Sequence, residues 1–408
     1  MDDKVQLTSL NDALVSILAN LTPVKGTKEI SLLDALGRVL AEDIISTINV
    51  PAHNNSAMDG YALRAEDLKQ SKTFKLAGSI HAGEIFAGNI EQFACVRIMT
   101  GAPVPQELDF VVPQEYVVFD KKNQTVEIKQ YTGGSNVRKA GEDLSIGSVA
   151  LHAGRKLGAS DIGLLASLGL SKVSICRKLK VGFFSTGDEL IEPGEYLLPG
   201  KIYDSNRYSV IAMLKNLRVK PLDLGIVKDE PAAIRKVFLQ AADSADVILT
   251  TGGVSVGDAD YVKQVLNEIG QIDLWRLNIK PGKPLAFGKI NQAYFFGLPG
   301  NPASAAVVFY KIVKPVLKTL MGQTRNIFSP DFKARVLNDI NKTSSRMEFM
   351  RGILNFEQDE PAVNVPANQG SGILSSMSKA DCLVILNENT KNVKAGDIVD
   401  VQPFYGLL

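Results

Sequence analysis

The sequence contains few of the residues that bind metals or form disulfides. Its 408 residues include three cysteines and three histidines. Cys95, Cys176 and Cys382 lie far apart and form no CxxC pair, so they indicate neither a zinc cluster nor a disulfide framework. We interpret them as reduced thiols of a cytoplasmic protein. If the chemistry of this protein needs sulfur ligands, the substrate must supply them.

An excess of one charge and long apolar runs are also absent. The 45 basic and 44 acidic side chains are interspersed and give a net charge of +1, which argues against a nucleic-acid partner. No apolar run reaches the ~18 residues that a membrane span needs. The polar first residues do not resemble a secretory signal. We therefore predict a cytoplasmic protein with neither nucleic acid nor membrane as a partner.

The pattern along the chain predicts several domains, because one core rarely serves so many residues. Apolar spacing predicts helices at 9–21, 31–42 and 157–170, and short β-rich runs occupy about 53–142. From Lys180 strands alternate with helices, which predicts a parallel sheet covered on both faces. Its expected strands are 181–186, 222–227, 246–251 and 294–300. A long helix follows at about 302–321, and the chain is then β-rich to its end.

Three of the expected strands end in polar, glycine-bearing loops. The carboxyl ends of parallel strands share one edge of a sheet, and ligands bind there. Glycine lets the backbone approach a ligand, and the helix N-termini that follow favour anions. We therefore predict an anion-binding site at this edge. Its candidate residues are Thr250, Gly252, Gly253, Ser255, Gly300 and Asn301.

Two familiar readings of these loops fail. The segment Gly253–Gly257 matches GxSxG, but a hydrolase of that type needs a histidine after Ser255, and all three histidines precede it. The chain also has no GxxxxGK[ST] loop and no strict GxGxxG, so ordinary NTPase and dinucleotide-binding folds lack their signature.

Charged residues accompany these loops. Glu189, Asp229 and Asp260 belong to a carboxylate set that suits Mg²⁺ bridging to a phosphate, although each alone is more typical of a helix cap or a solvated loop. Lys280 and Lys283 occupy a KPGKP turn whose prolines stiffen it, which suits a phosphate or an oxyanion. The alternative for the lysines is a solvated surface turn.

A series of longer blocks carries a family resemblance. In chain order they are NSAMDGYA from Asn55, RIMTGAPVP from Arg97, RKAGED from Arg138, FSTGDEL from Phe184, YDSNR from Tyr203, TTGGVSVGDADY from Thr250, IKPGKP from Ile279 and GLPGNP from Gly297. The series resembles the molybdopterin molybdenumtransferases and the C-terminal part of gephyrin, and it covers nearly the whole chain.

The resemblance implies an α/β multidomain fold. Its central domain, 179–327, has a doubly wound, mostly parallel sheet similar to the molybdopterin-binding fold. A β-rich domain at 46–145, a discontinuous helical linking domain at 1–45 and 146–178, and a C-terminal β-barrel at 328–408 complete it. The resemblance also implies a homodimer whose active cleft lies between the α/β domain of one subunit and the β-rich domain of the other.

The implied activity is insertion of molybdate into adenylylated molybdopterin with release of AMP, dependent on Mg²⁺. A molybdopterin adenylyltransferase would be the upstream partner. The resemblance assigns catalytic roles to Asp59, Glu189, Asp229, Asp260, Lys280 and Lys283. The four acids among them are also the implied metal ligands. The implied substrate-binding residues are the loop residues named above together with Thr100, Arg138, Asp143, Arg351 and Ser371. One departure is visible, since His53-Asn54 stands where the family commonly has an acid.

Two alternatives to the insertion enzyme remain open at this point. A non-catalytic scaffold of the gephyrin type could keep the fold, because a fold alone does not fix a function. The loop acids and lysines are present as a set, however, which a scaffold does not need. An adenylyltransferase acts on the same pterin, but such proteins are commonly short and have a single domain.

Overall fold

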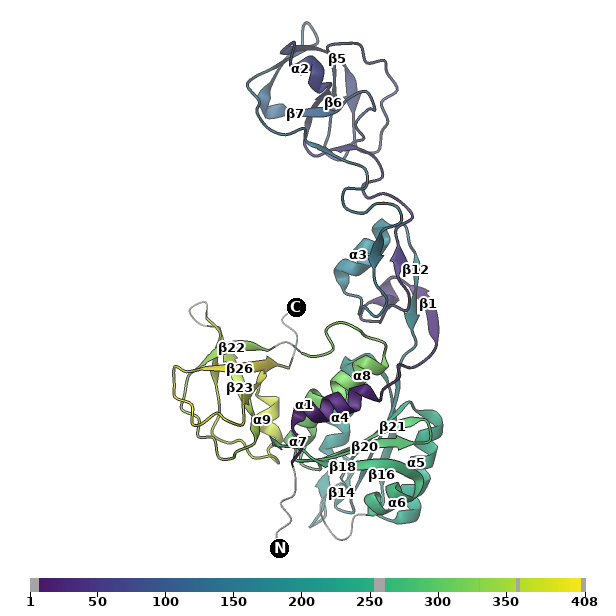
Figure 1. The fold of residues 1–408 in the computed structure, drawn as a ribbon, viewed down its shortest axis with the longest axis vertical. Helices are drawn as coiled ribbons and strands as arrows, with labels where there is room; N and C mark the ends of the chain where they lie inside the picture. The colour runs from purple at the N-terminus through teal and green to yellow at the C-terminus, as the bar shows by residue number, and fades with distance from the viewer. Residues whose placement is uncertain (1–6, 253–260, 330, 357–359, 405–408) are drawn as a thin grey trace.

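The molecule is elongated, with three regions along its length. The computed structural model describes residues 7–252, 261–329, 331–356 and 360–404. Figure 1 shows a β-rich region at one end, a small linking region in the middle, and the α/β domain beside the C-terminal barrel at the other end. Within the described ranges, no helix combines the length and the apolar character needed to cross a membrane.

The α/β domain is built on a six-stranded sheet. Its strand order is β16-β13-β17-β21-β20-β18, with the first four strands parallel and the last two antiparallel to their neighbours. The strands are β13 (Lys180–Thr186), β16 (Lys220–Val227), β17 (Val247–Thr251), β18 (Gly270–Arg276), β20 (Pro284–Ile290) and β21 (Ala293–Leu298). The four strands expected from the sequence and their parallel arrangement are confirmed.

Helices cover both faces of this sheet. Because successive strand residues point to opposite faces, Phe183 packs with Val210 of α4 (Ser205–Asn216), whereas Phe184 packs with Phe238 of α5 (Pro231–Ser244). The rings of Phe184 and Phe238 meet edge to face with centroids 5.0 Å apart. Helix α6 (Tyr261–Ile269) lies on the α5 face. The doubly wound architecture is therefore confirmed.

The expected long helix at 302–321 is continuous but not uniform. It begins as α7 (Pro302–Val308), passes through a π-helical segment η3 (Phe309–Val313) and ends as α8 (Lys314–Leu320). Pro315 has no N–H, and in a regular α-helix its ring would crowd the carbonyl of Lys311. The wider turn ahead of the proline accommodates it.

The first helix is confirmed as α1 (Leu10–Ala19), with Ser9 accepting the N–H of Asp12 at its start. Its buried residues Ala13 and Ile17 belong to the core of the α/β domain, next to α8. This helix therefore packs on the α/β domain, although it lies in the 1–45 segment assigned by resemblance to the linking domain.

The helix expected at 31–42 is wrong. Only a short 3-10 turn, η1 (Leu33–Ala35), forms there, and Leu40 makes a bridge to Ile175. Gly37 adopts a φ of +75°, which ends helical geometry. The apolar spacing instead serves a small core with helix α3 (Ala159–Ser167), which confirms the helix expected at 157–170.

Two strand pairs complete the linking region. Strand β1 (Thr27–Ser31) pairs with β12 (Lys172–Cys176), and β2 (Ile44–Ile45) pairs with β11 (Val149–Leu151). The chain thus runs out to the β-rich region and returns beside itself, as Figure 1 shows.

The β-rich region contains one six-stranded sheet with strand order β7-β4-β6-β5-β9-β8. Its strands are β4 (Gly60–Leu63), β5 (Thr73–Ile80), β6 (Ala94–Ile98), β7 (Phe110–Pro113), β8 (Val117–Asp120) and β9 (Thr125–Ile128), with a short helix α2 (Ala65–Leu68). A separate pair, β3 (Asn55–Ser56) and β10 (Val137–Arg138), lies beside it.

The C-terminal strands close into a barrel, as the resemblance implies. Strand β23 pairs with both β24 and β25, and the circle continues through β22 and β26. The strands are β22 (Phe332–Val336), β23 (Met347–Asn355), β24 (Ala362–Asn364), β25 (Cys382–Leu386) and β26 (Ile398–Pro403). Strand β19 (Ile279–Lys280), from the α/β domain, adds to β23 and joins the two domains.

Candidate active site

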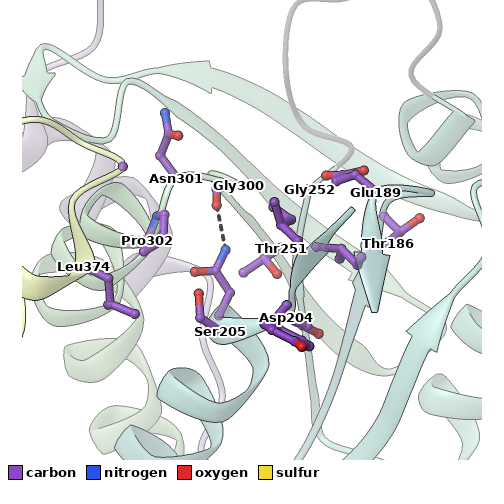
Figure 2. Close-up of a pocket in the computed structure, with 15 residues that line it drawn as sticks. Thr186, Glu189, Asp204, Ser205, Thr251, Gly252, Gly300, Asn301, Pro302 and Leu374 are labelled. Carbon is purple, nitrogen blue, oxygen red and sulfur yellow. Dashed lines mark hydrogen bonds between the residues drawn. The ribbon is translucent and has the colours of Figure 1, made fainter. Parts of the chain in front are cut away.

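A cavity of about 350 Å³ lies at the carboxyl ends of the parallel strands. Loops from the α/β domain form most of its wall, and the barrel adds Gly372 and Leu374 (Figure 2). This is the edge at which the sequence predicts a ligand site. The lining residues are Thr186, Glu189, Leu190, Ile202, Tyr203, Asp204, Ser205, Asn206, Thr251, Gly252, Gly300, Asn301, Pro302, Gly372 and Leu374.

Gly252 is required by the backbone at this edge. It adopts a φ of +90°, and a Cβ at this position would stand 2.5 Å from the carbonyl oxygen of Thr186. Both observations exclude any side chain without a shift of the β13 end. The glycine therefore brings the ends of β13 and β17 into close approach and leaves backbone at the cavity wall.

The loop after β21 is fixed from two sides. Gly300 accepts a hydrogen bond from Asn206 Nδ2 at 2.6 Å, and Asn301 is the N-cap of α7 without using its side chain as a cap. The N–H of Ala303 donates to the carbonyl of Ser371 at 3.0 Å. The barrel loop that carries Ser371 thus lies directly against the start of α7, next to the cavity.

Arg351 binds that barrel loop through hydrogen bonds from its buried guanidinium. It is 1% exposed, donates from Nε to Ser376 Oγ at 3.0 Å, and donates from its guanidinium to the carbonyl of Gly370 at 2.9 Å. Burial lowers the pKa of its guanidinium. Arg351 therefore contacts the loop rather than the cavity, and its position suits support of Ser371.

Acidic side chains crowd at the ends of β13 and β16. Glu189 lines the cavity, and the N–H of Asp229 lies 3.4 Å from Asp188 Oδ1. Burial, together with the negative charges of Asp188 and Glu189, raises the pKa of Asp229. A cation would relieve this repulsion, which fits Mg²⁺ shared with a phosphate. Among the described residues, no three acids, histidines or cysteines lie close enough to hold a metal by themselves.

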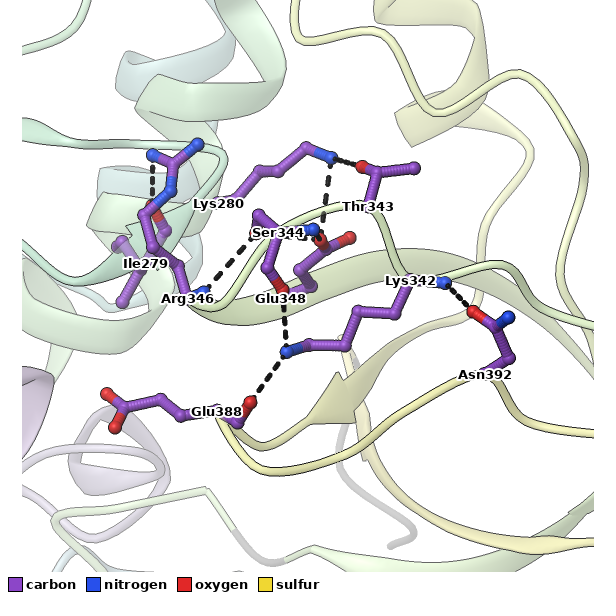
Figure 3. Close-up of polar contacts among 9 residues, drawn as sticks. All are labelled: Ile279, Lys280, Lys342, Thr343, Ser344, Arg346, Glu348, Glu388 and Asn392. Atoms are coloured by element: carbon purple, nitrogen blue, oxygen red, sulfur yellow. Dashed lines mark hydrogen bonds and ion pairs between the residues drawn. The ribbon is translucent and has the colours of Figure 1, made fainter.

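Lys280 is engaged by the barrel. Its ammonium contacts Thr343 Oγ1 and lies 3.5 Å from Glu348 Oε1 (Figure 3). Glu348 is 1% exposed and also accepts the N–H and the hydroxyl of Ser344 at 3.0 and 2.8 Å. The lysine is therefore held at the domain boundary and does not line the cavity.

Lys283 is exposed and also does not line the cavity. Between the two lysines, Gly282 adopts a φ of +103°, and a Cβ there would stand 2.8 Å from Val308 Cγ2 and 3.4 Å from the carbonyl oxygen of Ser304. The turn is thus pressed against α7, the helix whose N-terminus borders the cavity.

Thr250 is fully buried at the end of β17, and its Oγ1 has no hydrogen-bond partner in the part of the chain that the structure describes. Gly253, Ser255 and Asp260, which the sequence analysis also selects, lie outside the described residues. Their roles stay predictions.

Four selected residues lie in or beside the β-rich region instead. Asp59 accepts the N–H and the hydroxyl of Thr100, both at 2.7 Å, and these bonds lower the pKa of its carboxyl. Arg138 is exposed opposite Asn55 in the β10–β3 pair, and the N–H of Asp143 donates to Val50. Figure 1 places this region at the opposite end of the molecule from the α/β domain.

The cysteines take no part in either place. All three are free, and burial raises the pKa of Cys95 and of Cys382 to about 12, which keeps both thiols protonated. None of them lines the cavity.

The YDSNR motif carries part of the family resemblance, but none of its residues is among the predicted site residues. Tyr203, Asp204, Ser205 and Asn206 all line the cavity, because α4 begins at the same sheet edge as α7. The sequence contains a signal for this placement, since an Asp-Ser-Asn run before a helical pattern is typical of a helix N-terminus.

A mostly parallel sheet with a polar cavity at its strand ends, joined to a β-barrel and a distant β-rich domain, defines a multidomain α/β protein with a small-molecule site. Three family descriptions match in order: "MoeA N-terminal region (domain I and II)" at 8–169, "Probable molybdopterin binding domain" at 182–319 and "MoeA C-terminal region (domain IV)" at 333–404. The chain belongs to the MoeA family of transferases.

Individual relatives agree with this assignment. A molybdopterin molybdenumtransferase of Haemophilus influenzae is 42% identical over 403 residues, covering 98% of this chain and all of the relative. One from Staphylococcus epidermidis is 31% identical over 96% of this chain and 94% of its own length. The crystal structure of a molybdopterin biosynthesis MoeA protein from Pyrococcus horikoshii, 27% identical, aligns with a TM-score of 0.82 over 98% of this chain and all of that chain.

Proposed function

We propose that this protein, a molybdopterin molybdenumtransferase, inserts molybdate into adenylylated molybdopterin and releases AMP. The reaction would require Mg²⁺ and would take place in the cytoplasm. A molybdopterin adenylyltransferase would supply the substrate. The observation that carries the proposal is the cavity at the strand ends, whose wall combines backbone at Gly252 and Gly300 with Glu189, one of the crowded acids.

The substrates bring several negative charges together, so cations and N–H donors must offset their repulsion. The helix N-termini at the cavity would hold the phosphates, and Lys280 and Lys283, which lie outside the cavity wall, would reach them from the turn packed against α7. Thr250, Ser255 and Asn301 would donate or accept neutral hydrogen bonds. Arg138 and Ser371 would hold molybdate, and Arg351 would support Ser371. Thr100 and Asp143 would support the part of the β-rich region that carries Asp59.

Asp59, Glu189, Asp229 and Asp260 would hold Mg²⁺, which would offset phosphate charge. The dithiolene of the substrate forms two bonds from sulfur to molybdenum, and one oxo ligand leaves as water with the two thiol protons. Water cleaves the phosphoanhydride, AMP leaves, and the other phosphate stays on the pterin. The buried, protonated cysteines agree with a substrate that brings its own sulfur.

Incubation with molybdate, Mg²⁺ and adenylylated molybdopterin tests the activity. Formation of the molybdenum–pterin product with AMP supports insertion. Adenylation from ATP would instead indicate the adenylyltransferase, and an inert protein would indicate a scaffold. Asp59→Ala and Glu189→Ala should each lower insertion by orders of magnitude and leave folding intact, and wild-type rates in both would remove these roles.

We further propose a homodimer whose site combines Asp59 of one chain with the cavity of the other. The separation of the β-rich region from the α/β domain within one chain (Figure 1) supports this arrangement. Mixing and reassociating the inactive Asp59→Ala and Glu189→Ala chains then tests it. Half of the dimers would be mixed and one of their two sites intact, so insertion should return to about a quarter of the wild-type rate. No recovery would place each site within one chain.

A further inference from the structure

Asp204 is an acidic residue of the cavity wall that the proposed function leaves unused. It is 1% exposed and stands at the N-cap of α4, between Tyr203 and Ser205 on the cavity wall (Figure 2). Its Oδ1 accepts the N–H of Arg207 at 3.1 Å, and its own N–H donates to the carbonyl of Ile191. The side chain is thus fixed by the fold.

The second carboxylate oxygen has no such role. Asp204 Oδ2 is buried and has no hydrogen-bond partner among the residues that the structure describes. Buried polar atoms are nearly always paired, because an unpaired one keeps the cost of its lost hydration. Asp204 belongs to the cavity wall, so a small local shift would let a donor group that enters the cavity reach this oxygen.

The neighbouring cation does not neutralise Asp204. The guanidinium of Arg207 is bound to both oxygens of Asp223, at 2.6 and 3.0 Å, and to Glu192. These two acids raise the pKa of Arg207 further. The guanidinium of Arg207 therefore leaves the second oxygen of Asp204 available to a hydrogen-bond donor from elsewhere.

The surroundings limit what that donor is. A phosphate or molybdate oxygen would be repelled by the carboxylate. A divalent cation prefers several oxygen ligands, and one of the two oxygens of Asp204 already caps the helix. Leu190, Ile202 and Leu374 add apolar surface to the wall, which suits a flat heterocycle.

Resting on the proposed function, we propose that Asp204 Oδ2 accepts a hydrogen bond from the exocyclic amino group of a heterocycle of the substrate and thereby selects it. The adenylylated pterin carries two such groups, one on the pterin and one on the adenine. Both offer the same chemistry, and paired probes distinguish them.

The test measures dissociation constants for two pairs of ligands. 6-Hydroxymethylpterin monophosphate and its lumazine counterpart differ in an amino or oxo group at C2, and AMP and IMP differ in the same way at C6. Wild-type protein should bind the amino member of one pair about 10- to 100-fold more tightly, the range of one hydrogen bond to a charged acceptor. The discriminated pair identifies the heterocycle.

Two variants keep the helix cap and change the second oxygen. Asp204→Asn retains an oxygen for Arg207 and places an amide donor at the Oδ2 position, so the preference should vanish or reverse toward the oxo ligand. Asp204→Ser also caps but leaves that position empty, so affinity for the amino ligand should fall by the same 10- to 100-fold. The thermal midpoint of unfolding should hardly change in either variant.

Three results would overturn the proposal. An unchanged preference in Asp204→Asn would reduce Asp204 to a helix cap, as would the absence of discrimination in a wild-type protein that still inserts molybdenum. Binding of Mg²⁺ alone to wild type, lost in Asp204→Asn, would make the residue a metal ligand. If wild-type protein neither binds a probe nor inserts molybdenum, the proposed function itself fails.

Discussion

The cavity edge and the β-rich region both present carboxylates, but in opposite electrostatic states. Asp59 in the β-rich region is exposed, accepts two hydrogen bonds from Thr100 and has a lowered pKa. Asp229 at the cavity edge is crowded by other acids and has a raised pKa, and Asp204 keeps one oxygen unpaired. The β-rich acid is already satisfied as an anion, whereas the acids of the cavity edge retain mutual repulsion and one unpaired oxygen.

The largest effect should come from adding a side chain at Gly252, where the backbone forms part of the cavity wall. Gly252→Ala forces a side chain into a left-handed conformation and against Thr186, a strain of about 1–3 kcal/mol before the clash is counted. We expect a lower thermal midpoint of unfolding and a loss of more than about tenfold in affinity for the phosphorylated pterin.

Gly169→Ala is the matched control, because its φ of +78° is similar but nothing lies within 4 Å of its Cβ position. It should cost about 1 kcal/mol and leave binding unchanged. Equal losses of binding in both variants would show that general strain, and not the cavity backbone, is responsible.

Removing the support of the barrel loop should have the next largest effect. Arg351→Met deletes the hydrogen bonds to Ser376 and Gly370 and should lower the free energy of unfolding by about 2–4 kcal/mol in urea titrations. Arg335→Met, on barrel strand β22 and 3.8 Å from Glu360, should cost less than about 1 kcal/mol. Equal costs would mean that the buried guanidinium is not a support.

Neutralising one acid in each region should change stability in opposite directions. At neutral pH, Asp229→Asn removes repulsion and should stabilise by less than about 1 kcal/mol, while Asp59→Asn loses favourable bonds and should destabilise. The raised pKa of Asp229 means that its unfavourable contribution appears as pH rises through that value. The lowered pKa of Asp59 means that its favourable contribution is lost as pH falls through it.

Thermal unfolding from about pH 7 to about pH 3 checks both signs. Each variant should draw closer to wild type as pH falls, Asp229→Asn first, because the carboxyl of Asp229 takes up its proton at a higher pH than that of Asp59. The same sign for both variants would break the contrast between the two regions.

The smallest effect on activity should come from the thiols. Replacing Cys95, Cys176 and Cys382 together by alanine should leave the insertion rate within about twofold, while the lost packing costs about 1 kcal/mol at each buried site. Insertion is measured under conditions in which the variant is folded. A large loss of rate in the folded variant would show that a protein sulfur takes part in the chemistry.

Strong periodic patterns were sufficient for much of the fold. The near-continuous apolar strands from Lys180 predicted the parallel sheet, and the glycine-bearing loops predicted the edge at which the cavity lies. The helix expected at 31–42 was wrong because its apolar residues serve a small core of strands, and Gly37 breaks the helix. Apolar spacing over a short segment is compatible with either outcome.

By itself, the sequence determined the layered α/β domain, the family and the residue types available for chemistry, because these follow from local periodicity and contiguous motifs. Only the tertiary structure decided that Lys280 contacts Glu348 across a domain boundary, that Arg351 supports a loop, and that Asp204 keeps an unpaired oxygen at the cavity. Contacts between segments distant in the chain depend on how the domains close together, and no local pattern records that closure.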